Sequence, residues 1–476
     1  MKPRYSSARL GTEPVLPLLF KLSVPGIIGM AVQALYNVVD SIYIGHVSKD
    51  ALSALTLAFP IQMVLIALAV GSGVGATSLI SRTLGKGDTK MAGRIAEHVV
   101  IIAIVIGVTV AAAGALFSRQ LIDLFTDVPH LVEMGSDYIR IIMIGSFALF
   151  VPMLSNSILR GEGNTFIPMV TMIIGAFCNI LLDPFFIFGI GFFPELGVRG
   201  AAVATVLSRI ISGAFIIRVL FSDKNEVKIH MRGAHIQLGI FRQIYTVGLP
   251  VILMQLLGSV MLAGGNIILG SFGTTAIAVF GIFFRLQSFI LMPIFGLGQG
   301  VMPLMGYNFG SSNRERMKST AVIAYVTAFS FTFIGFLIFQ FFNRPLLSMF
   351  NADPELLRIG QEALSRISIG FLFVGPTIMS VNIFQSLGRG TPSLIIGFMR
   401  SIVLLLPCMY ILGQLYGLSM VWFAFPIAEA GTFLFAVTWL LMVLRRTLAG
   451  LETGPGLHPD SQTTSQVPAQ DRGETK

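Results

Sequence analysis

The chain has 476 residues, of which 54% are apolar and only 12% are charged, and its mean hydropathy is +0.82. Soluble domains carry about a quarter charged residues, so these values exclude an ordinary soluble protein and indicate a polytopic membrane protein. The net charge of +9 comes largely from basic residues beside apolar segments, which indicates membrane topology and contact with lipid rather than a nucleic-acid surface.

The apolar residues form blocks longer than the roughly 20 residues that a helix needs to cross a bilayer. We expect an all-α protein with twelve transmembrane helices, six in each half. In chain order the predicted spans cover residues 18–45, 52–80, 95–117, 132–158, 166–191, 200–221, 244–270, 275–304, 319–342, 357–386, 393–415 and 419–444. The predicted parts are a first lobe over 1–221, a cytoplasmic linker over 222–242, a second lobe over 243–446 and a disordered cytoplasmic tail over 447–476.

Basic residues gather in one alternate set of connecting segments. They precede span 1, lie between spans 2 and 3, fill the linker, follow span 8, and end with the pair Arg445 and Arg446. By the positive-inside rule both termini are therefore predicted to be cytoplasmic. We expect a multi-pass protein of the plasma (inner) membrane, monomeric, embedded in the lipid bilayer and without a nucleic-acid partner.

The second half of the chain repeats the first at a constant offset of 225 residues. The offset superposes Pro25 on Pro250, Gly85 on Gly310, and the glycines at 71, 73 and 75 on those at 296, 298 and 300. Because each copy has an even number of spans, the copies should be two pseudo-symmetric lobes related by an axis along the membrane normal, an arrangement typical of transporters. The repeated glycines are expected to allow close helix packing.

Several chemistries have no motif in this chain. There is no G-x-x-x-x-G-K-[ST] phosphate loop, no H-E-x-x-H or comparable metal-ligand spacing, and no nucleophile elbow. The sequence therefore predicts neither an enzyme nor a cofactor. If the protein moves small-molecule substrates, an ion gradient must supply the energy.

Few ionisable residues lie inside the predicted spans, and a charge at membrane depth is costly unless it is paired, neutralised or in contact with water. Each such residue is therefore a functional candidate. The set comprises Asp40, Asp183, Arg209, Arg285 and Glu429, with Glu97 and Arg400 nearer the span ends. In the second lobe, Arg285 and Glu429 are either a pair or two solitary cavity charges.

Two short polar patterns place the acidic residues beside other oxygen-bearing side chains. Asn37 and Asp40 are three residues apart in span 1, and Asn179 and Asp183 are four apart in span 5, so each pair shares a helical face. Span 6 adds the hydroxyl of Thr205. We interpret these residues as one site, with the alternative that they only join helices by hydrogen bonds.

Pro184 extends this pattern to the main chain. A proline removes one helical hydrogen bond and displaces the carbonyl four residues earlier, which here belongs to Ile180. Two carboxylates, an amide, a hydroxyl and a free carbonyl would suit a hard cation such as Na⁺. They would equally suit a proton, because two neighbouring carboxylates in a medium of low dielectric constant do not both stay ionised.

The repeat locates this chemistry in the first lobe alone. At the offset of 225 the second copy has no acid or amide where the first copy has its polar site: the residues there are Leu262, Gly265, Leu404, Cys408 and Ala430. The two copies are therefore predicted to share bends and packing but not the cation site.

The order and spacing of these features resemble the multidrug and toxic compound extrusion (MATE) family. The resemblance rests on the segments 22–25 and 247–250 at the start of spans 1 and 7 and on the loops 160–165 and 385–392, and it covers about residues 15–445. It implies a MATE-like fold of two six-helix lobes.

Within the family the chain is similar to the DinF-like branch. That branch has its cation site in the first lobe, as an Asp in span 1, an Asn-x-x-x-Asp in span 5 and a Thr in span 6, which match Asp40, Asn179, Asp183 and Thr205. The NorM-like branch instead has an acidic pair in the second lobe, and here Gln255 stands in place of its span-7 Glu.

The resemblance implies H⁺- or Na⁺-coupled antiport of organic, often cationic, amphiphiles by rocker-switch alternating access. It also implies a hinge, which we place at Pro25 and Pro184. We expect the substrate cavity to be lined by Gln33, Tyr36, Asn156, Gln255 and Arg285. The alternatives are a lipid-linked saccharide flippase of the same superfamily and a non-transporting membrane receptor or scaffold.

Overall fold

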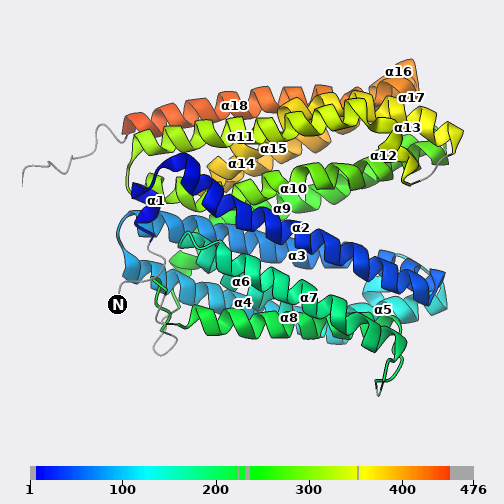
Figure 1. The fold of residues 1–476 in the computed structure, drawn as a ribbon, viewed down its shortest axis with the longest axis horizontal. Coiled ribbons are helices and arrows are strands. Elements are labelled where there is room, and N and C mark those ends of the chain that lie inside the picture. The colour runs from blue at the N-terminus through cyan, green and yellow to red at the C-terminus, as the bar shows by residue number, and fades with distance from the viewer. Residues whose placement is uncertain (1–6, 192, 223–224, 231–235, 351–352, 451–476) are drawn as a thin grey trace, which may run out of the picture.

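The computed structural model describes residues 7–191, 193–222, 225–230, 236–350 and 353–450, and every regular element in these ranges is a helix (Figure 1). Eleven helices are long and apolar enough to cross a membrane, and α5 with α6 forms a twelfth span if the bent pair is counted as one. The prediction of an all-α protein with twelve transmembrane helices is confirmed. Most of the predicted tail, from residue 451 onward, lies outside the described residues.

The first copy of the repeat begins with a short helix and continues through seven longer ones. They are α1 (Arg9–Thr12), α2 (Val15–Val47), α3 (Lys49–Gly85), α4 (Thr89–Asp123), α5 (Pro129–Ile144), α6 (Phe147–Gly161), α7 (Phe166–Phe188) and α8 (Val198–Leu220).

The second copy is more finely divided. Its helices are α9 (Leu238–Gly270), α10 (Thr274–Gly310), α11 (Arg314–Phe341), α12 (Asn343–Ser348), α13 (Pro354–Ile367), α14 (Phe371–Ser386), α15 (Gly390–Phe398), α16 (Leu406–Tyr416), α17 (Leu418–Val421) and α18 (Ala424–Gly450). A 3₁₀ turn (Ser368–Gly370) joins α13 to α14, and a π-helical segment (Met399–Leu405) joins α15 to α16.

Span 4 is not straight, although the sequence predicts one span over 132–158. Its two parts, α5 and α6, meet at an angle of 47° around Gly145. A methyl group at Gly145 would collide with the side chain of Val206 on α8, so the glycine allows this close approach and also weakens the helix locally. Span 10 is interrupted at the repeat-related position, Gly370. Both copies therefore depart from a regular α-helix at the same position, although within the described residues only span 4 bends by more than 40°.

The two halves meet where α3 crosses α9 and α10 crosses α2. A methyl group on Gly71 of α3 would collide with Ile252 of α9, and one on Gly296 of α10 would collide with Ile27 of α2. These two contacts are related by the repeat. The prediction that the glycine ladders allow close helix packing is confirmed.

The interface continues to the end of the molecule where α1 lies and α18 ends (Figure 1). There Gly85 and Gly310 lie against each other, since a methyl group on Gly310 would stand 3.1 Å from Gly85 Cα. A hydrogen bond also joins the halves, since Ser78 Oγ on α3 donates to the Gln385 carbonyl on α14 (2.5 Å). At the opposite end α5 lies apart from α12 and α13, so the two halves diverge (Figure 1).

The first turns of α2 and α9 are each buried in the hydrophobic core of the opposite half. Leu18 and Leu22, at the start of α2, are buried in a core with Leu297 and other residues of the second half. Conversely, Ile240 and Ile244 at the start of α9 belong to the core of the first half. Each half therefore covers its own core with the first turns of the other half.

The segment between the halves folds back onto the first half. The main-chain N–H of Val227 donates to Glu162 Oε1 (3.2 Å), and that of His230 donates to Glu97 Oε1 (3.0 Å). Glu162 follows α6 outside the membrane-spanning helices and is 2% exposed. Burial raises its pKa to about 8, and the bond from Val227 only partly offsets this effect.

The interface between the halves makes a stability prediction. In the Gly310→Ala variant the added methyl group would overlap the main chain of Arg82, so we expect a loss of about 1–3 kcal/mol in the free energy of unfolding. Gly258→Ala is the matched control, since nothing lies within 4 Å of its added methyl group. Thermal unfolding of the two purified variants should separate them, and equal stabilities would contradict the packing described here.

The buried Glu162 makes a prediction about pH. The folded-state pKa of Glu162, about 8, exceeds the ordinary value of 4.5. Between these two pH values the folded protein therefore keeps a proton on Glu162 that the unfolded chain has lost. The free energy of unfolding consequently falls as the pH rises from 4.5 to about 8. Glu162→Gln keeps an acceptor for Val227 and removes the ionisation. We expect this variant to have the higher unfolding temperature at pH 8 and to lose that advantage at pH 5. Parallel pH profiles for wild type and variant would contradict the assignment, and the exposed Glu133→Gln serves as control.

Candidate functional site

The first half brings the four predicted cation-site residues together from three helices. Asn179 and Asp183 lie on one face of α7, and the Asn179 side chain donates to Asp183 Oδ1 (3.1 Å) and to Thr205 Oγ1 on α8 (3.5 Å). All three are at most 5% exposed. Asp40 on α2 is half-buried and lies near enough to Asp183 for the two carboxylates to interact electrostatically. We refer to Asp40, Asn179, Asp183 and Thr205 as the acid cluster.

The acid cluster contains acceptor oxygens that no group in the described part of the chain satisfies. Asp40 Oδ1, Asp183 Oδ2 and Asn179 Oδ1 are all buried and lack a hydrogen-bond donor among the described residues. Leaving such acceptors without a partner is unfavourable by about 1–3 kcal/mol each. A cation or a proton would satisfy them, so these oxygens fit the chemistry predicted from the sequence.

The composition of the acid cluster also limits what it can bind. Within the described ranges, no group of three or more His, Cys, Asp or Glu side chains could hold a metal ion. Two carboxylates, one amide oxygen and one hydroxyl are hard oxygen ligands, which favour Na⁺ or H⁺ over a transition metal.

A second set of polar side chains surrounds the acid cluster. Arg209 on α8 interacts with the Tyr36 side chain on α2, and its charge acts on Asp40. Tyr138 on α5 lies within range of the same charges and accepts a hydrogen bond from Gln62 Nε2 on α3 (3.2 Å). The i,i+4 spacing from Asp40 to Tyr36 is visible in the sequence. The contribution of α3 and α5 arises only from tertiary packing.

Other predicted residues lie outside the acid cluster. Asn37 is exposed on α2, and Gln33 is half-buried. Asn156 on α6 is buried, and its Oδ1 has no donor among the described residues. Gln255 and Arg285 are exposed on α9 and α10 of the second half. Their assignment to a substrate cavity stays a prediction.

The predicted hinge prolines lie within continuous helices. Pro25 is inside α2, and Pro184 is inside α7, one residue after Asp183. The role of Ile180 as a carbonyl ligand and of both prolines as hinges stays a prediction.

The second half holds an ion pair close to the positions that match the first half's polar residues. Arg400 Nε donates to Glu429 Oε1 (2.7 Å), and Glu429 is 6% exposed. This contact resolves the alternatives for Glu429, whose partner is Arg400 rather than Arg285. The other carboxylate oxygen of Glu429, Oε2, is buried without a donor among the described residues. Arg400 lies in the π-helical segment between α15 and α16. The corresponding helix of the first half, α7, is a regular α-helix.

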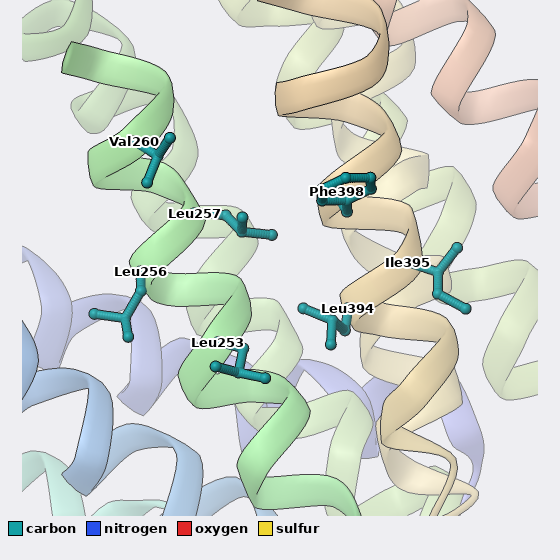
Figure 2. Close-up of a pocket in the computed structure, with 7 residues that line it drawn as sticks. All are labelled: Leu253, Leu256, Leu257, Val260, Leu394, Ile395 and Phe398. Atoms are coloured by element: carbon teal, nitrogen blue, oxygen red, sulfur yellow. The ribbon is translucent and has the colours of Figure 1, made fainter. Parts of the chain in front are cut away.

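An apolar groove lies between α9 and α15, also in the second half (Figure 2). It encloses about 420 Å³ and is lined by Leu253, Leu256, Leu257, Val260, Leu394, Ile395 and Phe398. No titratable side chain lines it, so it offers no ligand to a coupling ion.

The comparison with known families matches both copies of the repeat. The family model described as MatE matches residues 25–185 and again residues 250–411. The chain belongs to the MatE family. It is therefore a membrane transporter and not an enzyme, as the sequence predicts.

Relatives and solved structures that match most of the chain support its assignment to the MatE family. The chain is 29% identical to the multidrug export protein MepA of Staphylococcus haemolyticus over 87% of this chain and 91% of the relative. It is 26% identical to an FAD transporter of Shewanella oneidensis over 90% of this chain and 94% of the relative. A structure described as the outward-facing conformation of a multidrug resistance MATE family transporter is 29% identical, with a TM-score of 0.88, covering 94% of this chain and 99% of that one.

The ion pair of this MatE protein makes a third prediction. Arg400→Met leaves the Glu429 carboxylate buried without its partner, so we expect it to destabilise the protein by about 3 kcal/mol. The double variant Arg400→Met/Glu429→Gln removes both charges and should recover most of that loss. Thermal unfolding measures both variants, and a double variant that is less stable than the single one would contradict a purely structural pair.

Proposed function

We propose that this protein is a cation-coupled exporter of organic amphiphiles, driven by H⁺ or Na⁺ through the acid cluster, and that it is of the DinF-like type. The observation that carries the proposal is the set of buried, unsatisfied oxygens on Asp40, Asp183 and Asn179. A site left incomplete by the protein itself is suited to a transient occupant. The second half has no acid or amide at the matching positions, and its one buried acid there, Glu429, is paired with Arg400, which supports coupling through one lobe.

The acid cluster suggests how ion and substrate are coupled. A cation or proton bound between Asp40 and Asp183 neutralises the negative charge that would otherwise attract a cationic substrate. Ion and substrate then compete for the same carboxylates, and each promotes release of the other. This competition is the requirement for antiport.

The arrangement of the lobes supports a rocker-switch mechanism. The halves are in close contact at the end where α1 lies and α18 ends, and they diverge at the other end (Figure 1). If both termini are cytoplasmic, as the sequence predicts, the closed end faces the cytoplasm and the open end faces the outside. We infer that this is an outward-facing state. We infer that residues 1–221 and 243–446 rock as two lobes around the glycine-lined crossing, with Pro25 and Pro184 absorbing the bend.

The proposal is tested by transport in proteoliposomes. The full chain is reconstituted with the ethyl ester of rhodamine B, a fluorescent organic cation, and a pH gradient and a Na⁺ gradient are imposed separately. We expect one of the two gradients to drive export of the dye. Asp40→Asn and Asp183→Asn should each reduce the gradient-driven rate by about tenfold or more, because neither amide can take up the coupling charge.

The controls separate loss of coupling from loss of folding. Asp50→Asn removes an exposed carboxylate near the start of α3 and should transport at the wild-type rate. Size-exclusion profiles and vesicle flotation confirm folding and insertion for all variants. Wild-type rates in both site variants would refute the coupling role of the acid cluster, and no gradient-driven flux in the wild type would favour a receptor or scaffold.

A further inference from the structure

Arg209 places a positive charge beside the two carboxylates of the first lobe. It follows Thr205 by four residues on α8, so the two share a helical face. Tyr36 precedes Asp40 by one turn on α2, and its side chain interacts with Arg209. The guanidinium group therefore lies about one helical turn from the acid cluster, toward the end of the molecule where α1 lies.

The guanidinium group is not neutralised by a direct contact. Arg209 is half-buried, and among the described residues it forms no ion pair, in contrast to Arg400, whose Nε lies 2.7 Å from Glu429. An arginine at membrane depth is costly when it is not compensated. The repeat-related residue is Leu434, so the charge is not part of the shared scaffold.

The relatives leave the charge of the substrate open. One carries the name of a multidrug exporter and another that of an FAD transporter. The chemistry of this chain must therefore indicate the substrate class. Two carboxylates alone would select cations. A planar guanidinium group one turn away adds donors in a fork that matches a carboxylate.

We propose that Arg209 is a subsite for a carboxylate of the substrate, so that the first lobe selects zwitterionic amphiphiles over purely cationic ones. This inference rests on the proposed export function and names its substrate class. The cationic group of the substrate faces Asp40 and Asp183, and its carboxylate binds Arg209. Since a helical turn rises about 5.4 Å, we expect the two charged groups of the substrate to be separated by roughly that distance.

The test compares two dyes that differ in one group. Rhodamine B carries a free carboxylate beside its cationic ring system, and its ethyl ester is a cation with nearly the same shape. The full chain is reconstituted in proteoliposomes, and export of each dye is measured under the gradient that drives the wild type. Arg209→Gln should reduce export of rhodamine B about tenfold. Export of the ester should be unchanged or faster, because the variant removes a repulsive charge.

Two further variants separate charge selection from structural damage. Arg209→Lys keeps the charge without the planar fork and should restore export of rhodamine B in part. Arg218→Gln removes an exposed charge from the same helix, nine residues further on, and should leave the ratio of the two rates unchanged. If Arg209→Gln fails to fold, Arg209→Lys still tests the ratio.

The outcomes distinguish this inference from the proposed function. A wild type that exports the ester but not rhodamine B overturns the subsite and leaves the exporter intact. An equal fall for both dyes in Arg209→Gln, or an unchanged ratio, also overturns the subsite. A wild type that moves neither dye under either gradient overturns the proposed function and the subsite together. A selective loss of rhodamine B export supports both.

Discussion

A carboxylate inside a bilayer must have its charge compensated, and the organisation of this protein follows from how each half meets that requirement. In the second half, Glu429 is paired directly with Arg400 within the protein. In the first half, Asp183 receives one bond from Asn179, and oxygens of both acidic residues remain without a donor. The charge of Glu429 is compensated within the protein, although its Oε2 has no donor among the described residues. No ion pair compensates the two acidic residues of the first half in the described ranges, so a mobile cation or proton can do so. One scaffold thus holds a structural charge pair in one lobe and an exchangeable site in the other.

The close approach of the two halves depends on residues without side chains. Gly71 and Gly296 allow α3 and α10 to approach the partner helices so closely that a methyl group would not fit. Packing at this distance gains dispersion contacts where lipid offers no hydrophobic driving force between helices. It also concentrates the contact between the halves at the crossings of α3 with α9 and of α10 with α2.

Much of this architecture follows from one sequence because its signals are local or periodic. Span lengths come from apolar blocks, and the repeat reveals which residues serve packing. The i,i+4 relation between Asn179 and Asp183 is enough to place them on one helical face. The pairing of Arg400 with Glu429 joins different helices, and no spacing rule selects it over Arg285. The bend at Gly145 depends on Val206 of another helix, which is likewise invisible along the chain.

The exchange of helix ends between the cores has a consequence for how such a chain could have arisen. A single six-span copy would lack the α2 or α9 turns that cover its core, such as Leu22 in one direction and Ile244 in the other. It would expose that surface unless a second copy supplied the missing turns. A one-repeat ancestor with this packing would have been an obligate homodimer in which the first helix of each chain covers the core of the other. Duplication and fusion of its gene would join two molecules that already depend on each other.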